Sequence, residues 1–256
     1  MKSGFLRRSW SGPDFGKTFF GKGFLPLLIA AFVVAGCGSG PSSPAAANSQ
    51  AEAAAPQAEG QIPADVYPDS RNRLPLVKRE DLDERGKKVY DEIAGDSRNL
   101  AGLQGPGGIR LNNPRLSELN TPVSAYLRFE NGLGPRLTQL AFLVAARGID
   151  SQFEWTAHEP AALKVGVSQE LIDIVKYNKP LTGVDEKDAA IIQLGREAFG
   201  PRKVSSETFK TALNLFGKET LINLVSFIGY QAQTGVLLVV LDQQLPPGQK
   251  PLLPIP

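Results

Sequence analysis

The sequence predicts an all-α domain of about eight helices, preceded by a disordered leader and linker. Three observations predict this class: apolar residues recur at helical spacing, no segment alternates with the period of a strand, and Ser, Asp, Gly and Pro punctuate the apolar segments. The segments expected to be helical are residues 82–93, 116–131, 137–147, a segment opening at Asp150 or Ser151, and residues 169–177, 186–199, 205–216 and 219–241.

The apolar pattern indicates the expected buried face of some helices more clearly than that of others. One apolar stripe in residues 116–131 is formed by Leu116, Leu119, Val123 and Leu127. Pro122 lies inside that segment and is expected to kink or interrupt it. The glycine-rich residues 102–108 are expected to form a loop, and they lack the Lys-Ser/Thr sequel of a phosphate-binding loop.

The segment 219–241 is apolar nearly all round. Such a helix is buried in a core or in a subunit interface, and a membrane span is the alternative. Five polar residues inside the segment disfavour the span. They are Asn223, Ser226, Gln231, Gln233 and Thr234.

Residues 1–37 resemble a lipoprotein signal peptide. An apolar run at residues 24–36 is too short to span a bilayer and ends in Val34-Ala35-Gly36-Cys37, which is similar to a bacterial lipobox. Cys37 is then the lipidation site, although an ordinary signal with an incidental cysteine is the alternative. Gly38 in place of aspartate favours, by resemblance to sorting signals, an exported envelope protein anchored in the outer membrane and facing the periplasm.

Residues 38–62 form the predicted flexible linker, and residues 63–256 the folded domain. The linker consists largely of Ala, Pro, Ser, Gln and Gly, which bury too little apolar surface to offset the entropy of ordering. The tether would join a membrane anchor at Cys37 to the domain.

Charge and cysteine content exclude several functions for the folded domain. Five of the 28 basic residues and one of the 26 acidic residues fall within residues 1–37, which leaves 23 basic and 25 acidic residues, a net charge of −2. This balance gives no electrostatic case for nucleic acid. With one histidine and no cysteine after Cys37, we predict no metal site, no disulfide and no cofactor.

The candidate active site is built on His158, the single histidine of the chain. Glu154 precedes it by four residues, so the two side chains share one face of a helix. Imidazole can exchange a proton near neutral pH, and a neighbouring carboxylate can orient it. A competing interpretation is that Ser151-x-x-Glu154 is a capping box and His158 a structural residue. Pro160 is expected to bend this helix just beyond His158.

The domain resembles the carboxymuconolactone decarboxylase family, which includes the alkylhydroperoxidase D proteins. The resemblance covers roughly residues 75–245. It is carried by Tyr126-Leu127-Arg128, by residues 137–147 ending in Ala145-Ala146-Arg147, by Glu154-Trp155-x-x-His158-Glu159-x-x-Ala162-x-x-x-Gly166, and by residues 172–174. It implies an all-helical fold and a homo-oligomer, trimer or hexamer, with sites near the subunit interfaces.

The resemblance also shows which chemistry is missing. The peroxidase branch uses two redox cysteines, and the matching positions here hold Ser151 and Glu154, while the position of its helper glutamate falls near Gln139. Thiol-based peroxide reduction therefore cannot run by that route, since the thiolate is the nucleophile.

The decarboxylase branch implies a lyase-like enzyme acting on a small carboxylated or lactone substrate. By this resemblance His158 is the proton donor and Glu154 its orienting partner. Arg128 or Arg147 would hold the substrate carboxylate, and Tyr126 and Trp155 would wall the pocket. The alternative is a non-catalytic envelope lipoprotein that uses the fold for binding or assembly. A ring that faces a cavity containing an arginine favours the enzyme.

Overall fold

The structure, a computed structural model, describes residues 62–95 and 102–255. Within those ranges the chain forms eight α-helices and one short 3-10 helix, and its strand-like pairing is limited to an isolated bridge between Tyr67 and Asn72. The predicted all-α class is confirmed. The predicted signal peptide with its lipidation site at Cys37 and nearly all of the predicted linker lie outside the described residues.

Most helices begin and end close to the expected residues. Their bounds are η1 Arg79–Asp81, α1 Glu84–Ala94, α2 Pro106–Arg110, α3 Pro114–Phe129, α4 Gly134–Gly148, α5 Gln152–Lys164, α6 Gln169–Lys176, α7 Glu186–Phe199 and α8 Ser206–Val240. The agreement has a local cause, because polar side chains cap several helix starts. The Ser168 hydroxyl accepts from Leu171 N at 3.2 Å, and Asp185 accepts from Lys187 N at 3.0 Å.

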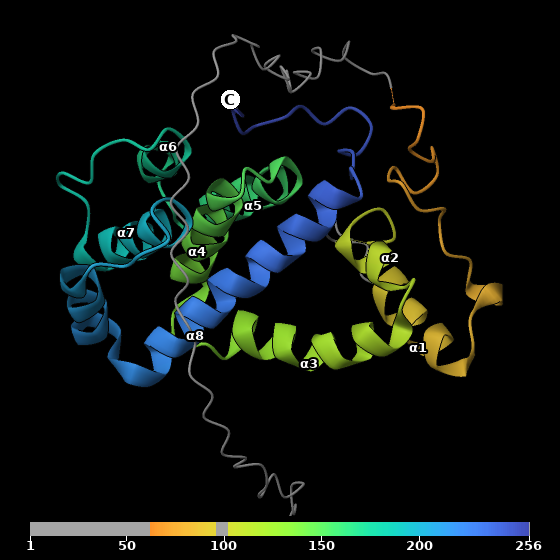
Figure 1. Cartoon of the computed structure of the whole chain (residues 1–256), viewed down its shortest axis with the longest axis horizontal. Coiled ribbons are helices and arrows are strands. Elements are labelled where there is room, and N and C mark those ends of the chain that lie inside the picture. The colour runs from red at the N-terminus through yellow and green to blue at the C-terminus, as the bar shows by residue number, and fades with distance from the viewer. Residues whose placement is uncertain (1–61, 96–101, 256) are drawn as a thin grey trace, which may run out of the picture. The chain divides into compact units, whose positions relative to one another are not determined.

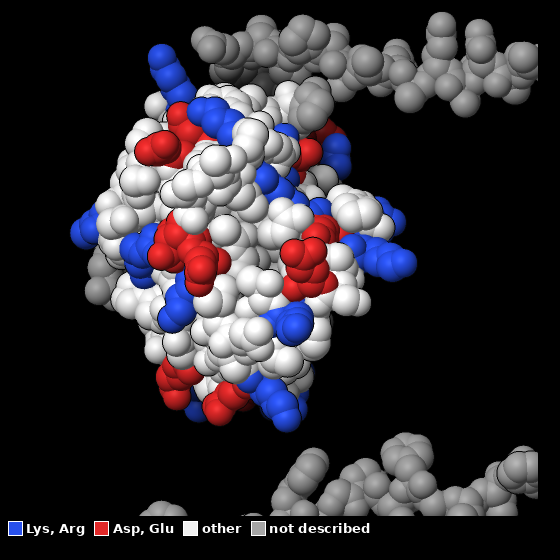
Figure 2. Space-filling view, turned by 90° about the vertical axis from the view of Figure 1, so that its left-hand side faces the viewer, with Lys and Arg blue, Asp and Glu red and all other residues white. Residues whose placement is uncertain are grey.

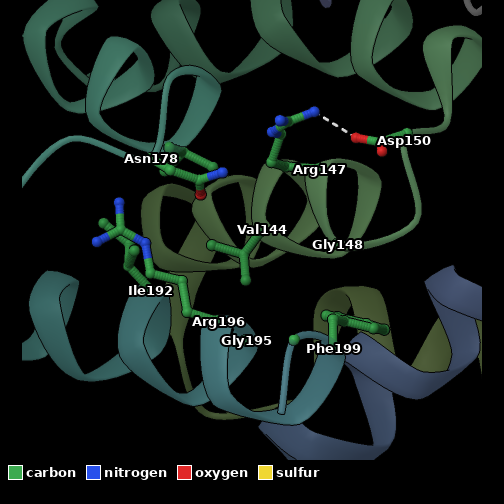
Figure 3. A pocket seen from close by; sticks show the side chains of 11 residues that line it. Val144, Arg147, Gly148, Asp150, Asn178, Ile192, Gly195, Arg196 and Phe199 are labelled. Atoms are coloured by element: carbon green, nitrogen blue, oxygen red, sulfur yellow. Dashed lines mark hydrogen bonds and ion pairs between the residues drawn. The ribbon is translucent and has the colours of Figure 1, made fainter. Parts of the chain in front are cut away.

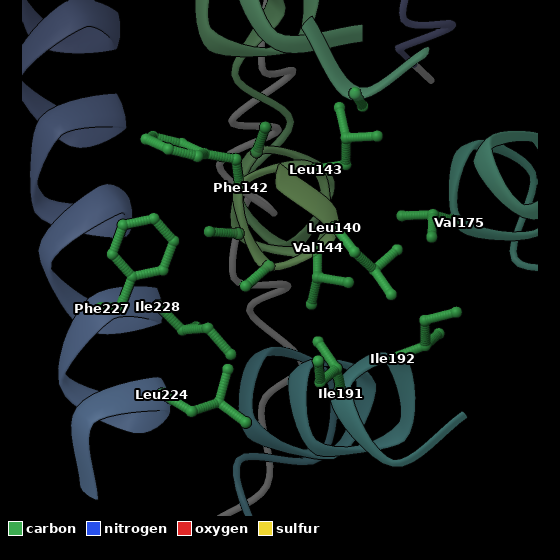
Figure 4. Packing of buried hydrophobic residues seen from close by; sticks show 14 of the residues in the cluster. Leu140, Phe142, Leu143, Val144, Val175, Ile191, Ile192, Leu224, Phe227 and Ile228 are labelled. Carbon is green, nitrogen blue, oxygen red and sulfur yellow. The ribbon is translucent and has the colours of Figure 1, made fainter. Parts of the chain in front are cut away.

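Helix α4 is the central element. It packs against α5, α6, α7 and α8 (Figure 1). Its residues from Leu140 to Ala146 are all buried, and Figure 4 shows Phe142 of α4 on the side of α8 and Val144 on the side of α7. A helix enclosed on most sides needs apolar residues on most of its faces, which explains the wide apolar pattern of this segment.

One local expectation differs from the structure. Residues 106–110, expected within or just after a loop, form the short helix α2, which begins with proline at its first position. Pro122 and Pro160 lie inside α3 and α5, and both helices continue past them. The expected break between the two C-terminal helices is confirmed: α8 includes both segments, and Gly217, with φ of 72° and ψ of 173°, interrupts the helical path between them.

The predicted apolar stripe of α3 is largely exposed. Leu127 is buried, whereas Leu116, Leu119 and Val123 are each about half exposed and Phe129 is 81% exposed. Helix α8 packs beside α3 and also exposes apolar side chains, including Ile222 and Val225. These five exposed residues of the two helices, Leu119, Val123, Phe129, Ile222 and Val225, are called the α3–α8 apolar face below.

Length and composition alone would allow α8 to cross a membrane. Of its most apolar 18-residue window, 44% is buried inside the described part of the protein.

On the side shown in Figure 2, acidic and basic side chains are interspersed without a single-sign patch. This mixed surface agrees with the near-neutral charge of the domain.

Close packing of α7 on α4 depends on Gly195. A Cβ atom at this position would lie 2.0 Å from Val144 Cγ1, and Val144 is buried and β-branched, so it has little room to move. We expect Gly195→Ala to lower the free energy of unfolding by about 1–3 kcal/mol, measured by urea denaturation. Gly229→Ala on α8 is the control, because no atom lies within 4 Å of its Cβ position. A neutral or stabilising Gly195→Ala would contradict this packing.

Candidate active site

Helix α5 places Glu154 and His158 on the side that faces α4. Glu154 Oε2 lies 3.8 Å from His158 Nε2, and the side chains are 7% and 15% exposed, respectively. This separation is longer than a hydrogen bond, so the carboxyl group and the ring are adjacent without being bonded. The four-residue spacing therefore brings the two groups together as predicted.

Residues of α4 fix the imidazole ring. Its Nδ1 lies 3.0 Å from Gln139 Oε1, and its face stacks on Phe142 with ring centroids 3.6 Å apart and planes 13° from parallel. Because a carbonyl oxygen only accepts, the proton of the neutral ring is on Nδ1 and the lone pair is on Nε2. The Nε2 lone pair is thus directed to the side on which Glu154 lies.

The pair lines a cavity of about 600 Å³. Arg128 also lines it, and the Arg128 guanidinium lies 5.1 Å from the centroid of the Phe142 ring. Most of the remaining wall comes from α5 and from the C-terminal segment, including Phe153, Thr156, Gln249, Lys250 and Leu252, and Pro106 and Gln139 complete it. The criterion set by the sequence, a ring facing a cavity with an arginine, is met.

Burial changes the proton affinities of both groups. It raises the pKa of Glu154 to about 7, although the positive charges of Arg128 and Arg110 oppose the shift. It lowers the pKa of His158 to about 3, and Arg128 lowers it further because two cations repel. At neutral pH the ring is therefore uncharged, and Glu154 is the group of the pair that gains and loses a proton.

The competing capping-box interpretation is wrong. Ser151 is the N-cap residue of α5, but its side chain makes no capping hydrogen bond, and its buried Oγ has no partner among the described residues. Glu154 makes no return bond to the cap either; it points into the cavity. Its carboxyl group thus stays available for chemistry.

Trp155 does not wall the cavity. It is fully buried, and its indole Nε1 donates to Glu159 Oε2 on the other side of α5. Lys176 Nζ of α6 donates to Glu159 Oε1 at 2.9 Å and lies 5.6 Å from the centroid of the Trp155 ring. The predicted wall residue is instead part of a buried cluster that joins α5 to α6.

Arg147 and Tyr126 are also placed away from His158. Arg147 forms an ion pair with Asp150 and lines a separate cavity of about 400 Å³ between α4 and α7 (Figure 3). Tyr126 is partly exposed, and its hydroxyl lies 3.2 Å from Asn223 Nδ2 of α8, which donates to it. Of the four predicted substrate-binding residues, the structure brings only Arg128 to the cavity.

Two parts of the site were missed in the sequence. Phe142 was not among the predicted site residues, yet its ring stacks against the imidazole of His158. The C-terminal segment was not assigned to the site, although Leu253 is buried and its N–H donates to Gln152 Oε1 at 2.8 Å. The apolar Leu252-Leu253 pair between prolines was the available signal that this segment packs back on the domain.

Comparison with known proteins identifies a structural relative but no family. No family model matches the chain, and no curated protein matches it. Among solved structures, the chain is similar to the debrominase Bmp8, determined as a cysteine-to-alanine variant in complex with 2,3,4-tribromopyrrole. The match covers 67% of this chain and 90% of that chain, with a TM-score of 0.54 and 14% sequence identity. At this identity the similarity shows a shared helical fold.

Proposed function

We propose that the domain is a carboxymuconolactone decarboxylase-like enzyme that moves a proton on a small carboxylated or lactone substrate. The observation that carries the proposal is the placement of Glu154, His158 and Arg128 around one cavity. An arginine can hold a substrate carboxylate, and a buried acid with a pKa near 7 can transfer a proton at neutral pH. We include in this proposal that the domain has an alkylhydroperoxidase D-like fold.

The pKa values reverse the roles that the sequence suggested. With a pKa of about 3, His158 is a poor proton donor at neutral pH, whereas Glu154 with a pKa of about 7 is well suited to that role. Glu154 then delivers the proton to the substrate carbon or removes it. His158 is the neutral partner whose Nε2 can accept a hydrogen bond from protonated Glu154 after a small approach.

In a lyase reaction, the bond to the leaving carboxylate breaks and its electron pair remains on the substrate. Conjugation with an unsaturated ring spreads that charge, and a proton from Glu154 then neutralises the carbon. Arg128 would orient the carboxylate before the bond breaks. An unsaturated lactone that carries a carboxylate provides both the anion, which leaves as CO₂, and the conjugated acceptor that this sequence of events requires.

The relative with a known ligand supports a small, flat substrate. Bmp8 binds 2,3,4-tribromopyrrole, a small aromatic ring. The cavity here is lined by His158, and Phe142 stacks behind that ring. A planar substrate can lie against the imidazole in the same manner.

A thiol-dependent peroxidase or peroxiredoxin-type activity is disfavoured. The single cysteine of the chain is Cys37, which precedes the folded domain, and the positions expected for redox cysteines hold Ser151 and Glu154. Peroxide consumption by the full-length chain with an added thiol should be no faster than in buffer.

The enzymatic proposal is tested by turnover of small unsaturated lactones that carry a carboxylate. We expect CO₂ release from at least one of them, and we expect Glu154→Gln to reduce kcat about 10²–10⁴-fold because the transferable proton is lost. Glu170→Gln, an exposed glutamate on α6, is the control and should retain full activity. Turnover that survives Glu154→Gln would contradict the assigned role.

The second candidate function is a non-catalytic envelope module. It is favoured by one observation, that Gln139 already occupies His158 Nδ1. In that case no tested substrate is consumed, and any small molecule that native mass spectrometry finds on the purified chain is released unchanged. Conversion of a bound molecule that stops in Glu154→Gln would instead support the active site.

We also propose that the chain assembles as a homo-oligomer, a trimer or hexamer, and is held at the outer membrane by a lipid on Cys37. The α3–α8 apolar face supports assembly, because two adjacent helices both expose apolar side chains. Sedimentation velocity should give a multimer that Ile222→Asp dissociates. Mass spectrometry should find the lipid on Cys37.

A further inference from the structure

A further cavity of about 320 Å³ lies between α1, α2, α3 and α8, and both polar and apolar residues line it. It shares Pro106 and Arg128 with the cavity of Glu154 and His158 but otherwise has its own residues. Hydroxyl and amide groups contribute to the lining, among them Ser124, Thr234 and Asn120. The cavity is not used by the proposed proton transfer.

Arg110, at the end of α2, is the distinctive group of this cavity. Its Nη2 donates to Thr234 Oγ1 at 2.6 Å, and its guanidinium lies 5.7 Å from the centroid of the Tyr230 ring. Among the described residues, Arg110 forms no ion pair, and its other N–H groups make no hydrogen bond. Arg110 lines the cavity and is only partly buried, so its side chain is accessible from it.

The Arg110 guanidinium is partly buried, and its partners, a hydroxyl group and an aromatic ring, carry no negative charge. A cation removed from water is costly unless an anion compensates it. Among the described residues that line the cavity, Arg110 and Arg128 are basic and Glu92 is the single acidic residue.

We propose that this cavity is a binding site for an oxyanion, a carboxylate or a phosphate group, which Arg110 holds through its free N–H donors. The planar guanidinium can bind two oxygens of such a group side by side. Ser124 and Asn120 provide further polar contacts, and Tyr230 provides an apolar wall for the body of the ligand. The shared wall at Arg128 places the anion next to the Glu154 cavity.

A purely structural role for Arg110 makes a different prediction. Its positive charge acts on Glu154 and opposes the rise in the pKa of that residue. If this were its whole role, removing Arg110 would change the titration of Glu154 without changing any anion affinity. Anion binding is measured without turnover, so its failure leaves the proton-transfer proposal untouched.

The test is isothermal titration calorimetry of the full-length chain with inorganic phosphate and, separately, with acetate, at constant ionic strength in chloride. We expect saturable binding of at least one anion with a Kd at or below about 1 mM. Preference for phosphate identifies a phosphate site, and preference for acetate identifies a carboxylate site. The absence of saturation with both anions would overturn the proposal.

Variants locate the binding at Arg110. Arg110→Gln should weaken the affinity at least tenfold, and Arg110→Lys should weaken it less, because it keeps the charge but loses the paired donors. Arg202→Gln, an exposed arginine after α7, is the matched control and should bind as the wild type does. If Arg110→Gln does not fold, Arg110→Lys and Thr234→Val carry the test, and unchanged affinity in both would contradict the site.

Discussion

Replacing Lys176 by methionine is expected to lower the free energy of unfolding by about 3–5 kcal/mol. The Lys176 and Glu159 side chains are 9% and 10% exposed, and Nζ lies 2.8 Å from Glu159 Oε2. Without the lysine, the Glu159 carboxylate stays buried and keeps only the Trp155 indole N–H as a donor. A buried charge without its counter-ion is the cause of the loss.

Lys179→Met is a matched control for this effect. Lys179 also forms an ion pair, at 3.5 Å from Asp173, and also lies over an aromatic ring, that of Tyr177. Its side chain is about half exposed, so the same substitution should cost less than about 1 kcal/mol. Equal losses for the two lysines, measured by urea denaturation, would show that burial of the pair is not the cause.

The double variant Glu159→Gln, Lys176→Met should recover part of the stability. A neutral glutamine needs no counter-ion, and its carbonyl oxygen can still accept the bond from the Trp155 indole. A double variant that is less stable than Lys176→Met alone would contradict this account of the cluster.

Replacing His158 by glutamine is expected to reveal a pH dependence that the wild type conceals. The folded-state pKa of His158 lies below its ordinary value of 6.5, so its contribution to stability is present above pH 6.5 and is lost as the pH falls toward 3. The folded-state pKa of Glu154 lies above its ordinary value of 4.5, so its contribution is present below pH 4.5 and is lost as the pH rises toward 7. Between pH 4.5 and 6.5 the two slopes oppose each other.

Each slope amounts to about 1.4 kcal/mol per pH unit. Relative to the wild type, His158→Gln should therefore gain about 3 kcal/mol as the pH falls from 6.5 to 4.5. Glu154→Gln should gain a similar amount as the pH rises over the same range. The measurement is urea denaturation at half-unit pH steps, and the difference from the wild type removes the contributions of all other groups.

Glu170→Gln on the exposed side of α6 controls for the loss of a carboxyl group. Its stability should run parallel to that of the wild type across the range. Parallel curves for His158→Gln and Glu154→Gln as well would mean that neither group is perturbed by burial.

The fold could be predicted because the local sequence indicates most of the helices. The caps at Ser168 and Asp185 and the wide apolar pattern of α4 depend on residues close in sequence. Helix α2 was missed because its glycines favour a loop, and only its packing against α3 and the N-terminal proline favour a helix. Tertiary contacts outweighed local propensity there.

The site was predictable only where its groups share one helix. Glu154 and His158 are four residues apart, so their proximity follows from helix geometry. The positions of Arg147 and Trp155 depend on how each helix is rotated about its axis relative to its neighbours. The spacing of residues in the sequence does not determine this rotation. Arg147 pairs with Asp150 and lines a different cavity, and Trp155 lies beside Lys176 on the side of α5 away from the His158 cavity. Arginine and tryptophan are suitable residue types for an active site, but these two side chains do not line the cavity of His158.

The proton affinities were the largest error at the level of chemistry. The sequence suggested a donor histidine with an ordinary pKa near neutrality, whereas burial beside Phe142 and the charge of Arg128 disfavour the imidazolium. Burial depends on contacts made by α4 and the C-terminal segment, which lie far from His158 in the sequence. The role of proton carrier therefore moved to Glu154.

The most direct measurement is a titration of the imidazole nitrogens of the full-length chain by NMR, with ¹⁵N-labelled histidine. His158 is the only histidine, so the two ring signals need no assignment to a residue. We expect a neutral ring with the proton on Nδ1 from about pH 8 to about pH 5, and a small shift of Nε2 with a midpoint near pH 7 as Glu154 titrates. Protonation of the ring with a midpoint near pH 6.5 and no separate transition from Glu154 would contradict the proposed division of roles.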